Sequence, residues 1–221
     1  MTNARADRVD IASWILTAGQ FGLAGAIAWL GPTHPLPMHY NIDGVVDRWG
    51  DRAEMAFVVL VLAVICAAIL AFRRFAARAR SGPVLAEFAG VLVLSMIAAL
   101  AASLTWGLVD QPGPRFGTAV ISVTMAFIGA LLGKTSPNAL IGVRTPWTFG
   151  SRLAWDKSNR LAGRLFFWGG LVGLIAAPFA PQPDGFRAVQ FGVLAIAAIA
   201  VFESWRIWLI DPDRGKAWRA E

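Results

Sequence analysis

The residues with the clearest chemical potential lie in a polar segment, residues 136–163, between two apolar runs. Arg144 presents a rigid fork of five N–H donors, which suits a carboxylate or a phosphate group. Pro146 favours extended backbone just after this arginine, and Gly142 allows close backbone approach just before it. The pattern therefore predicts a turn that aims Arg144 at an anionic group or an acidic partner.

A charged stripe follows this turn at helical spacing. Its members are Arg152, Asp156, Arg160 and Arg164. Thr148 or Ser151 is expected to cap the helix that carries them, because a side-chain oxygen at that place accepts from a free N–H. The stripe predicts a docking surface for a partner or an anion. A basic segment that anchors the chain to lipid head groups is the alternative interpretation.

A second group of chemically capable residues lies near the N-terminus. His39, Asp43 and Asp47 supply one imidazole and two carboxylates, which is a donor set for a divalent metal. The alternative is a structured loop, because Asn41 and Asp43 favour turns and Gly44 supplies a positive φ. No established metal-ligand spacing occurs in this segment.

Ionisable residues also lie within apolar blocks, where charge is costly and suggests a function. Glu87 lies early in one block. Glu203 and Arg206 lie three residues apart in another, so they are predicted to pair along one helix face. A polar cluster that these residues share and a purely structural ion pair both remain open.

The elements that must position these residues are membrane-spanning helices. The chain has 221 residues, of which 57% are hydrophobic, and its mean hydropathy is +0.57. The apolar residues gather in blocks of about 20, the length with which a helix crosses a bilayer. The blocks lie approximately at residues 11–31, 54–72, 84–108, 116–133, 161–180 and 188–210. The sequence predicts an all-α integral membrane protein with a six-helix transmembrane bundle.

The distribution of positive charge predicts the orientation. If the N-terminus is cytoplasmic, 16 of the 20 Lys and Arg residues fall in cytoplasmic segments, as the positive-inside rule requires. Both termini are therefore expected in the cytoplasm. The segment at residues 134–151 becomes an inner loop and the segment at 32–53 an outer loop. The net charge of +6 follows from this topology and does not indicate a nucleic-acid partner.

Glycines inside the apolar blocks predict close helix packing. Gly22 and Gly25 lie in the first block, and Gly169, Gly170 and Gly173 lie in the fifth. Small residues at such spacings let the backbones of two membrane helices approach each other.

The order of residues in the inner loop resembles a known family. Pro137-Asn138 is followed by Ile-Gly-Val-Arg-Thr-Pro-Trp-Thr at 141–148 and then by Trp155, which is similar to the signature of the SdpI-type immunity proteins. Together with the charged stripe, this resemblance gives the candidate binding residues of the inner part of the chain. They are Asn138, Gly142, Arg144, Thr145, Pro146, Trp147, Trp155 and Arg160.

The outer loop resembles a small N-terminal domain that is common in the same family. The sequence LPMHYNIDG and the following DRW match its pattern at His39, Asn41, Gly44, Asp47 and Trp49. Val46 stands where members often have proline. By this resemblance His39, Asn41 and Asp47 are further candidate binding residues.

The resemblance implies a function and an organisation. Residues 1–72 would form an N-terminal helix pair with its extracytoplasmic loop, and residues 84–221 a four-helix SdpI-like region. We expect a multi-pass protein of the bacterial cytoplasmic membrane that protects against a secreted peptide toxin. It would also sequester a cytoplasmic transcriptional repressor as a signalling receptor. Its partners would be toxin, repressor and membrane lipids.

On this interpretation the chain is no enzyme and needs no cofactor, apart from a divalent metal at the outer loop. A metal-dependent membrane enzyme or a small-molecule transporter is the alternative. An enzyme would use the metal at the outer loop to activate a water molecule. A transporter would need a polar site near the middle of the membrane.

Overall fold

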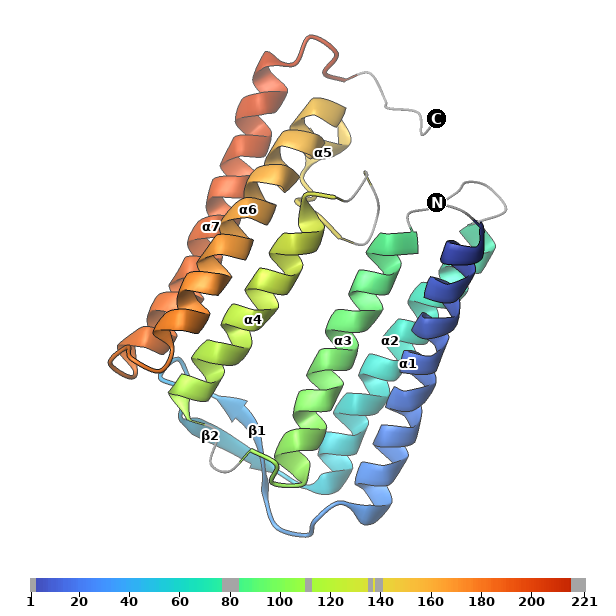
Figure 1. Ribbon diagram of the computed structural model, residues 1–221, viewed down its shortest axis with the longest axis vertical. Coiled ribbons are helices and arrows are strands. Elements are labelled where there is room, and N and C mark those ends of the chain that lie inside the picture. Colours follow the sequence, from blue (N-terminus) through green and yellow to red (C-terminus); the bar gives the residue numbers. More distant parts are fainter. Residues whose placement is uncertain (1–2, 77–83, 110–112, 135–136, 138–140, 216–221) are drawn as a thin grey trace. The chain divides into compact units, whose positions relative to one another are not determined.

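The computed structural model describes residues 3–76, 84–109, 113–134, 137 and 141–215. Within them the chain folds into α1 (Asn3–Leu30), β1 (Leu36–Tyr40), β2 (Val46–Gly50), α2 (Arg52–Ala76), α3 (Val84–Thr105), α4 (Pro114–Leu132), α5 (Pro146–Phe149), α6 (Arg152–Ala176) and α7 (Asp184–Ile210). The predicted all-α membrane class is confirmed, with one short hairpin as the sheet (Figure 1). The chain divides into two compact units, residues 1–113 and 114–221.

The first unit is a three-helix bundle. Helices α1, α2 and α3 lie side by side (Figure 1). Ile27, Val59 and Ala98 lie in its buried apolar core. One polar group crosses the bundle, because the Gln20 Nε2 atom donates to Ser95 Oγ at 2.7 Å and contacts Cys66 Sγ at 3.4 Å. Hydrogen bonding of this kind satisfies a buried amide away from water.

The outer loop folds into an antiparallel hairpin between α1 and α2. Leu36 pairs with Gly50 and Tyr40 with Val46, with irregular register between them. The turn follows the predicted chemistry: Asn41 Oδ1 accepts from the backbone N of Asp43 at 2.9 Å and of Val45 at 3.0 Å, and Gly44 has φ 73°. Leu36 is fully buried in the bundle core, which attaches the hairpin to the helices.

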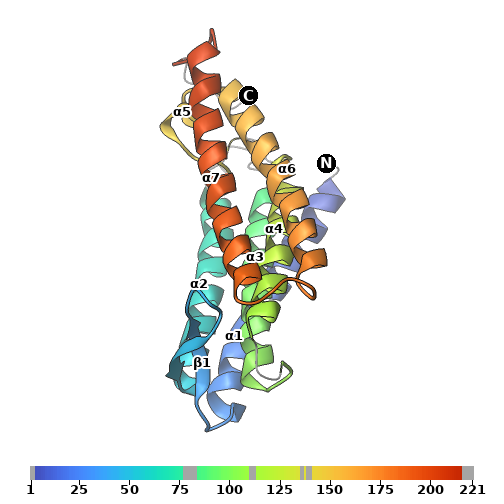
Figure 2. The same cartoon turned by 90° about the vertical axis from the view of Figure 1, so that its left-hand side faces the viewer.

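The second unit packs α4, α6 and α7 with the short α5 at one end (Figures 1 and 2). Helices α4 and α6 approach at backbone distance. A Cβ atom on Gly163 would lie 2.9 Å from Gly133 N and 3.0 Å from Gly129 O, and one on Gly170 would meet backbone atoms of Ala126. These glycines are required for the contact, as is usual for membrane helix pairs.

The glycine prediction is correct for Gly170 and Gly173 of the second unit and wrong for Gly22 and Gly25 of the first, while at Gly169 a Cβ atom would meet only side-chain ends at 3.5 Å. Gly170 and Gly173 face α4, where a Cβ on Gly173 would meet the side chain of Ser122. At Gly22 and Gly25, by contrast, a Cβ would meet nothing within 4 Å. Glycine in a helix therefore marks close packing only where a second backbone lies opposite.

Five helices of the described residues are long and apolar enough to cross a membrane. They lie at Arg8–Leu30, Arg52–Phe72, Glu87–Thr105, Pro114–Leu132 and Asp184–Ile210. The remaining predicted span, residues 161–180, which is the fifth in chain order, falls largely in α6. That helix begins nine residues earlier than the predicted span and includes Arg160 and Arg164. The six-helix count and the cytoplasmic termini remain predictions.

Helix α3 belongs with α1 and α2. The sequence-based division placed residues 84–108 with the C-terminal helices, whereas in the structure α3 packs on α1, α2 and β1 and the unit boundary follows Gly113. The physical reason is the shared core of the first unit, to which α3 contributes Ala98 and Ala101.

Candidate functional site

The inner loop is fixed first at Gly142. Its φ of +141° is a conformation that residues with a Cβ atom rarely adopt. A Cβ atom here would also lie 2.7 Å from the Trp155 ring and 2.9 Å from Asn159 Oδ1. That same Oδ1 atom accepts from Val143 N at 2.7 Å, while Asn159 Nδ2 donates to Trp155 O at 3.0 Å. One buried amide thus ties the loop to α6.

The next step of the loop is the one-turn helix α5. Thr145 is its N-cap and Pro146 its first residue, which places proline where a helix lacks an N–H partner anyway. Thr145 and Thr148 form a reciprocal capping box: Thr148 N donates to Thr145 Oγ1 at 3.2 Å, and Thr145 N to Thr148 Oγ1 at 2.9 Å. Thr145 Oγ1 also lies 3.0 Å from Ser204 Oγ of α7.

A second cap connects the loop to the end of α7. Ser151 Oγ accepts from Ala154 N at 2.9 Å and donates to Asp211 Oδ2. Gly215 N donates to Gly150 O at 3.0 Å. The prediction of Ser151 as a helix cap is confirmed, whereas α5 is capped by Thr145 and Thr148 is the residue that completes its capping box.

These contacts hold Arg144 at the surface. Thr145, Thr148, Ser151, Trp155 and Asn159 are buried, whereas Arg144 is exposed. Pro146 is also exposed and Trp147 is half-buried. Because hydroxyl and amide groups satisfy the backbone beneath it, the loop presents the guanidinium from a fixed frame, as recognition of an anion requires.

Two of the predicted binding residues are not seen at the surface of the loop. Trp155 is fully buried, with its ring centroid 6.3 Å from that of Phe149, so it supports the loop from inside. Asn138 lies outside the described residues. Direct contact with a partner is therefore open to Arg144, Pro146 and Trp147 in the described loop, and Gly142, Thr145 and Trp155 position them.

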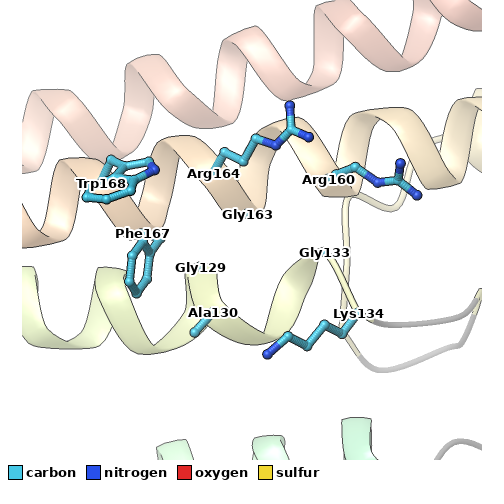
Figure 3. A pocket seen from close by; sticks show the side chains of 9 residues that line it. All are labelled: Gly129, Ala130, Gly133, Lys134, Arg160, Gly163, Arg164, Phe167 and Trp168. Carbon is cyan, nitrogen blue, oxygen red and sulfur yellow. The ribbon is translucent and has the colours of Figure 1, made fainter.

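The charged stripe of α6 is exposed along its length. Arg152, Asp156, Arg160 and Arg164 are all solvent-facing in the structure. Arg160 and Arg164 line a groove between α4 and α6 that also includes Lys134 (Figure 3). The stripe therefore has two parts. Arg152 and Asp156 do not line this groove, whereas Arg160 and Arg164 do.

The predicted pairing of Glu203 with Arg206 along one face of α7 is present. The guanidinium of Arg206 donates to both carboxylate oxygens of Glu203 at 2.7 and 2.8 Å. Bidentate pairs of this kind are the strong ones. Glu87 is buried in α3 of the first unit, and the two acids belong to different units.

The outer hairpin joins two of its three predicted metal ligands. His39 Nδ1 lies 2.6 Å from Asp47 Oδ1, and both side chains are exposed. Asp43 lies in the turn, where its backbone N bonds to Asn41. No group of three or more His, Cys, Asp or Glu side chains is gathered for a metal in the part of the chain that the structure describes. Asn41 acts as a turn residue.

Three supporting residues were missed from the sequence. Asn159 lies on α6, 16 residues after Val143, whereas Ser204 and Asp211 lie 59 and 60 residues after their partners, and all three are buried. The available signals were a polar residue one turn after Trp155 and an acid directly after the last apolar block. Neither signal shows which backbone group the side chain will satisfy.

Comparison with known proteins supports the importance of this region. Residues 134–203 match the sequence model of the SdpI/YfhL protein family. The matched segment runs from Lys134 through the inner loop and α6 to Glu203 of α7. The predicted family resemblance is confirmed there, while the N-terminal motif lies outside the match. No curated protein and no solved structure matched the chain. Together with the apolar helices, the match supports a multi-pass membrane protein whose residues 134–203 are similar to the SdpI/YfhL protein family.

Proposed function

We propose that this SdpI-type membrane protein is an immunity protein, which protects its cell against a secreted peptide toxin that acts on the membrane. The observation that carries the proposal is the family match over residues 134–203. The helices supply the required location, since several are long and apolar enough to span a bilayer. The cytoplasmic membrane of a bacterium is the proposed site.

The inner loop would act as the responsive part of the protein. Supporting this role, the loop is bound to α6 through Asn159 and to α7 through Ser204 and Asp211. A shift between these two helices would therefore move Arg144 with the loop. Because an exposed guanidinium binds carboxylates well, the proposed inner partner is an acidic surface of a cytoplasmic transcriptional repressor.

The outer hairpin would meet the toxin. It carries exposed apolar side chains at Ile42, Val45 and Trp49, together with the exposed His39–Asp47 pair. Exposed aromatic and aliphatic residues on a small ordered element suit contact with an apolar peptide. The hairpin would meet the toxin and the inner loop would carry the response, so protection would require both parts of the chain.

A dose–response experiment tests this proposal. Toxin-sensitive bacteria would express the chain or an empty vector, and survival would be measured against increasing peptide toxin from an SdpI-type system. Protection should raise the inhibitory concentration of the toxin at least about tenfold. A tenfold shift corresponds to about 1.4 kcal/mol of toxin-binding free energy, and weaker binding would give a smaller shift. Equal sensitivity with and without well-expressed protein would refute toxin immunity.

The repressor step has its own measurement. A fluorescent fusion of the repressor encoded with the toxin system should move to the membrane when the chain and toxin are both present. Arg144→Ala should abolish this movement, and Arg152→Ala, an exposed arginine on α6, should leave it intact. Recruitment that is unchanged in Arg144→Ala would refute the proposed inner contact while leaving immunity itself to the survival experiment.

A further inference from the structure

A groove between α4 and α6 is lined by basic, aromatic and small residues, and the proposed immunity function assigns it no role. Its volume is about 330 Å³. It is lined by Gly129, Ala130, Gly133, Lys134, Arg160, Gly163, Arg164, Phe167 and Trp168. Figure 3 shows Lys134 at the end of α4, both arginines on α6, and the Phe167 ring between the two helices.

The groove exists because its floor has no side chains. Gly129 and Gly163 are buried where the two backbones meet. At Gly133 a Cβ atom would have only Arg160 Cα nearby, at 3.6 Å, which is ordinary van der Waals contact. A larger side chain at Gly133, which lines the groove, would therefore extend into it from a position in ordinary contact with α6.

One end of the groove is cationic. Lys134, Arg160 and Arg164 are exposed, and within the described residues none of the three has an acidic partner. Figure 3 shows the Arg164 guanidinium and the Lys134 amino group turned away from each other, as expected for like charges, which repel one another. An anion that accepts N–H bonds from two guanidinium groups would relieve this repulsion, and phosphate matches the arginine fork well.

The other end of the groove is apolar. Phe167 is half-buried and Trp168 is 63% exposed. Arg160, Arg164 and Trp168 follow one another at i, i+4 and i+8 on α6, a distance of about 12 Å along the axis. The head-group layer on each side of a bilayer is only about 5–8 Å thick. With the cations at that layer, the tryptophan end reaches the hydrocarbon.

The order of a cationic end followed by an aromatic end along the groove indicates which kind of molecule would fill it. A soluble phosphate compound would use the cationic end alone and leave the aromatic end facing lipid. A phospholipid has its phosphate and its acyl chains in the same order as the groove has its cations and its aromatic rings. Basic pockets between membrane helices on the cytoplasmic side are a known form of anionic lipid site.

We propose that the α4–α6 groove binds one anionic glycerophospholipid of the phosphatidylglycerol class. Arg160, Arg164 and Lys134 contact its phosphate, and Phe167 and Trp168 contact the first carbons of its acyl chains. The site depends on the membrane location of the chain and is independent of any toxin. Failure of toxin protection would therefore leave this proposal standing, and the reverse also holds.

Lipid retention by the full-length purified protein tests the proposal. The protein would be reconstituted with equimolar phosphatidylglycerol and phosphatidylcholine of identical acyl chains, extracted in mild detergent, and its bound lipids counted by native mass spectrometry. Phosphatidylglycerol should be retained in preference, at one molecule per chain. Equal retention of the two lipids would overturn the proposal.

Matched variants locate the site. Arg160→Gln/Arg164→Gln should lower phosphatidylglycerol affinity about thirtyfold, at about 1 kcal/mol for each cation. The control Arg152→Gln/Lys157→Gln removes the same charge from exposed positions of the same helix and should stay within about threefold of the unchanged protein. Equal losses in the two variants would show general charge attraction and overturn the groove assignment.

Two further measurements test the proposal even if the arginine variant does not fold. Gly133→Leu fills the groove without changing charge and should also abolish retention; wild-type retention in this variant would contradict the proposal. In the unchanged protein, glycerol 3-phosphate and inorganic phosphate at millimolar concentration should fail to displace the lipid. Displacement by either compound would identify a soluble anion as the ligand instead.

Discussion

At the scale of single residues, the inner loop depends on one position that accepts only glycine and one buried amide. Gly142 combines a φ of +141° with close approach to Trp155 and Asn159. Asn159 satisfies Val143 N on one side and its own helix on the other. The exposed Arg144 owes its fixed position to these neighbours, so changes beneath it should affect function as strongly as changes at the arginine.

Gly142→Ala should destabilise the folded protein by about 2–6 kcal/mol, because strained backbone and an overpacked contact each contribute about 1–3 kcal/mol. Gly192→Ala in α7 is the control, since a Cβ there would meet nothing within 4 Å. Unfolding of the purified proteins by SDS in mixed micelles measures the difference. Equal stability of the two variants would contradict the role given to Gly142.

Asn159→Leu should loosen the loop without unfolding the unit. It removes the acceptor of Val143 N, and an unpaired buried N–H costs about 1–3 kcal/mol. Trypsin cleavage after Arg144 should therefore become several times faster. Ser158→Ala is the control, because Ser158 Oγ bonds only to carbonyl oxygens of its own helix. Cleavage at the same rate in both variants would argue against the amide as the main tie.

At the scale of the elements, the sequence predicts the helices well and their contacts poorly. Periodic apolar blocks predict where helices lie, because a membrane helix must satisfy its own backbone. Glycine spacing predicted the α4–α6 contact correctly at Gly170 and failed at Gly22 and Gly25. Which helix lies opposite a glycine depends on tertiary packing, and a single sequence does not record it.

The same reason explains what was missed at the site. The loop motif is contiguous, so Gly142, Arg144 and Ser151 could be recognised from their neighbours. Ser204 and Asp211 lie about 60 residues away from the threonine and serine that they contact. Only the fold brings such residues together. The hairpin was expected as a loop because its strands are five residues each and follow proline-rich sequence.

Gly170→Val should separate α4 from α6. Its Cβ would meet the Ala126 backbone, including Cα at 3.0 Å, and backbone atoms cannot move aside as side-chain ends do. We expect destabilisation of about 1–3 kcal/mol, read as a lower midpoint in SDS unfolding. Gly192→Val introduces the same side chain at an open position and controls for helix propensity. A larger effect at Gly192 would contradict the packing account.

At the scale of the whole molecule, the chain is a multi-pass membrane protein with two compact units, and its charge distribution predicts its orientation in the membrane. The basic residues predict cytoplasmic termini and an extracytoplasmic hairpin. Within each unit the consecutive long helices run in alternating directions (Figure 1), as successive membrane spans would. Helix α6 is the exception in composition, since Arg160 and Arg164 lower its hydropathy.

Cysteine labelling of intact cells tests this orientation. Ile42→Cys in the exposed hairpin turn should react with a membrane-impermeant maleimide from outside, whereas Leu153→Cys at the exposed start of α6 should react only after permeabilisation. The natural Cys66 is fully buried and should contribute little background. Labelling of Leu153→Cys in intact cells would overturn the predicted cytoplasmic inner loop.

The central claim is that this chain protects the membrane through its inner loop, and membrane potential tests it most directly. Sensitive cells expressing the wild type, Arg144→Ala or Arg152→Ala would be exposed to the membrane-active peptide toxin, and a potential-sensitive dye followed over time. The account predicts a maintained potential with the wild type and with Arg152→Ala, and collapse with Arg144→Ala at equal expression. Collapse in cells with the wild type would contradict it.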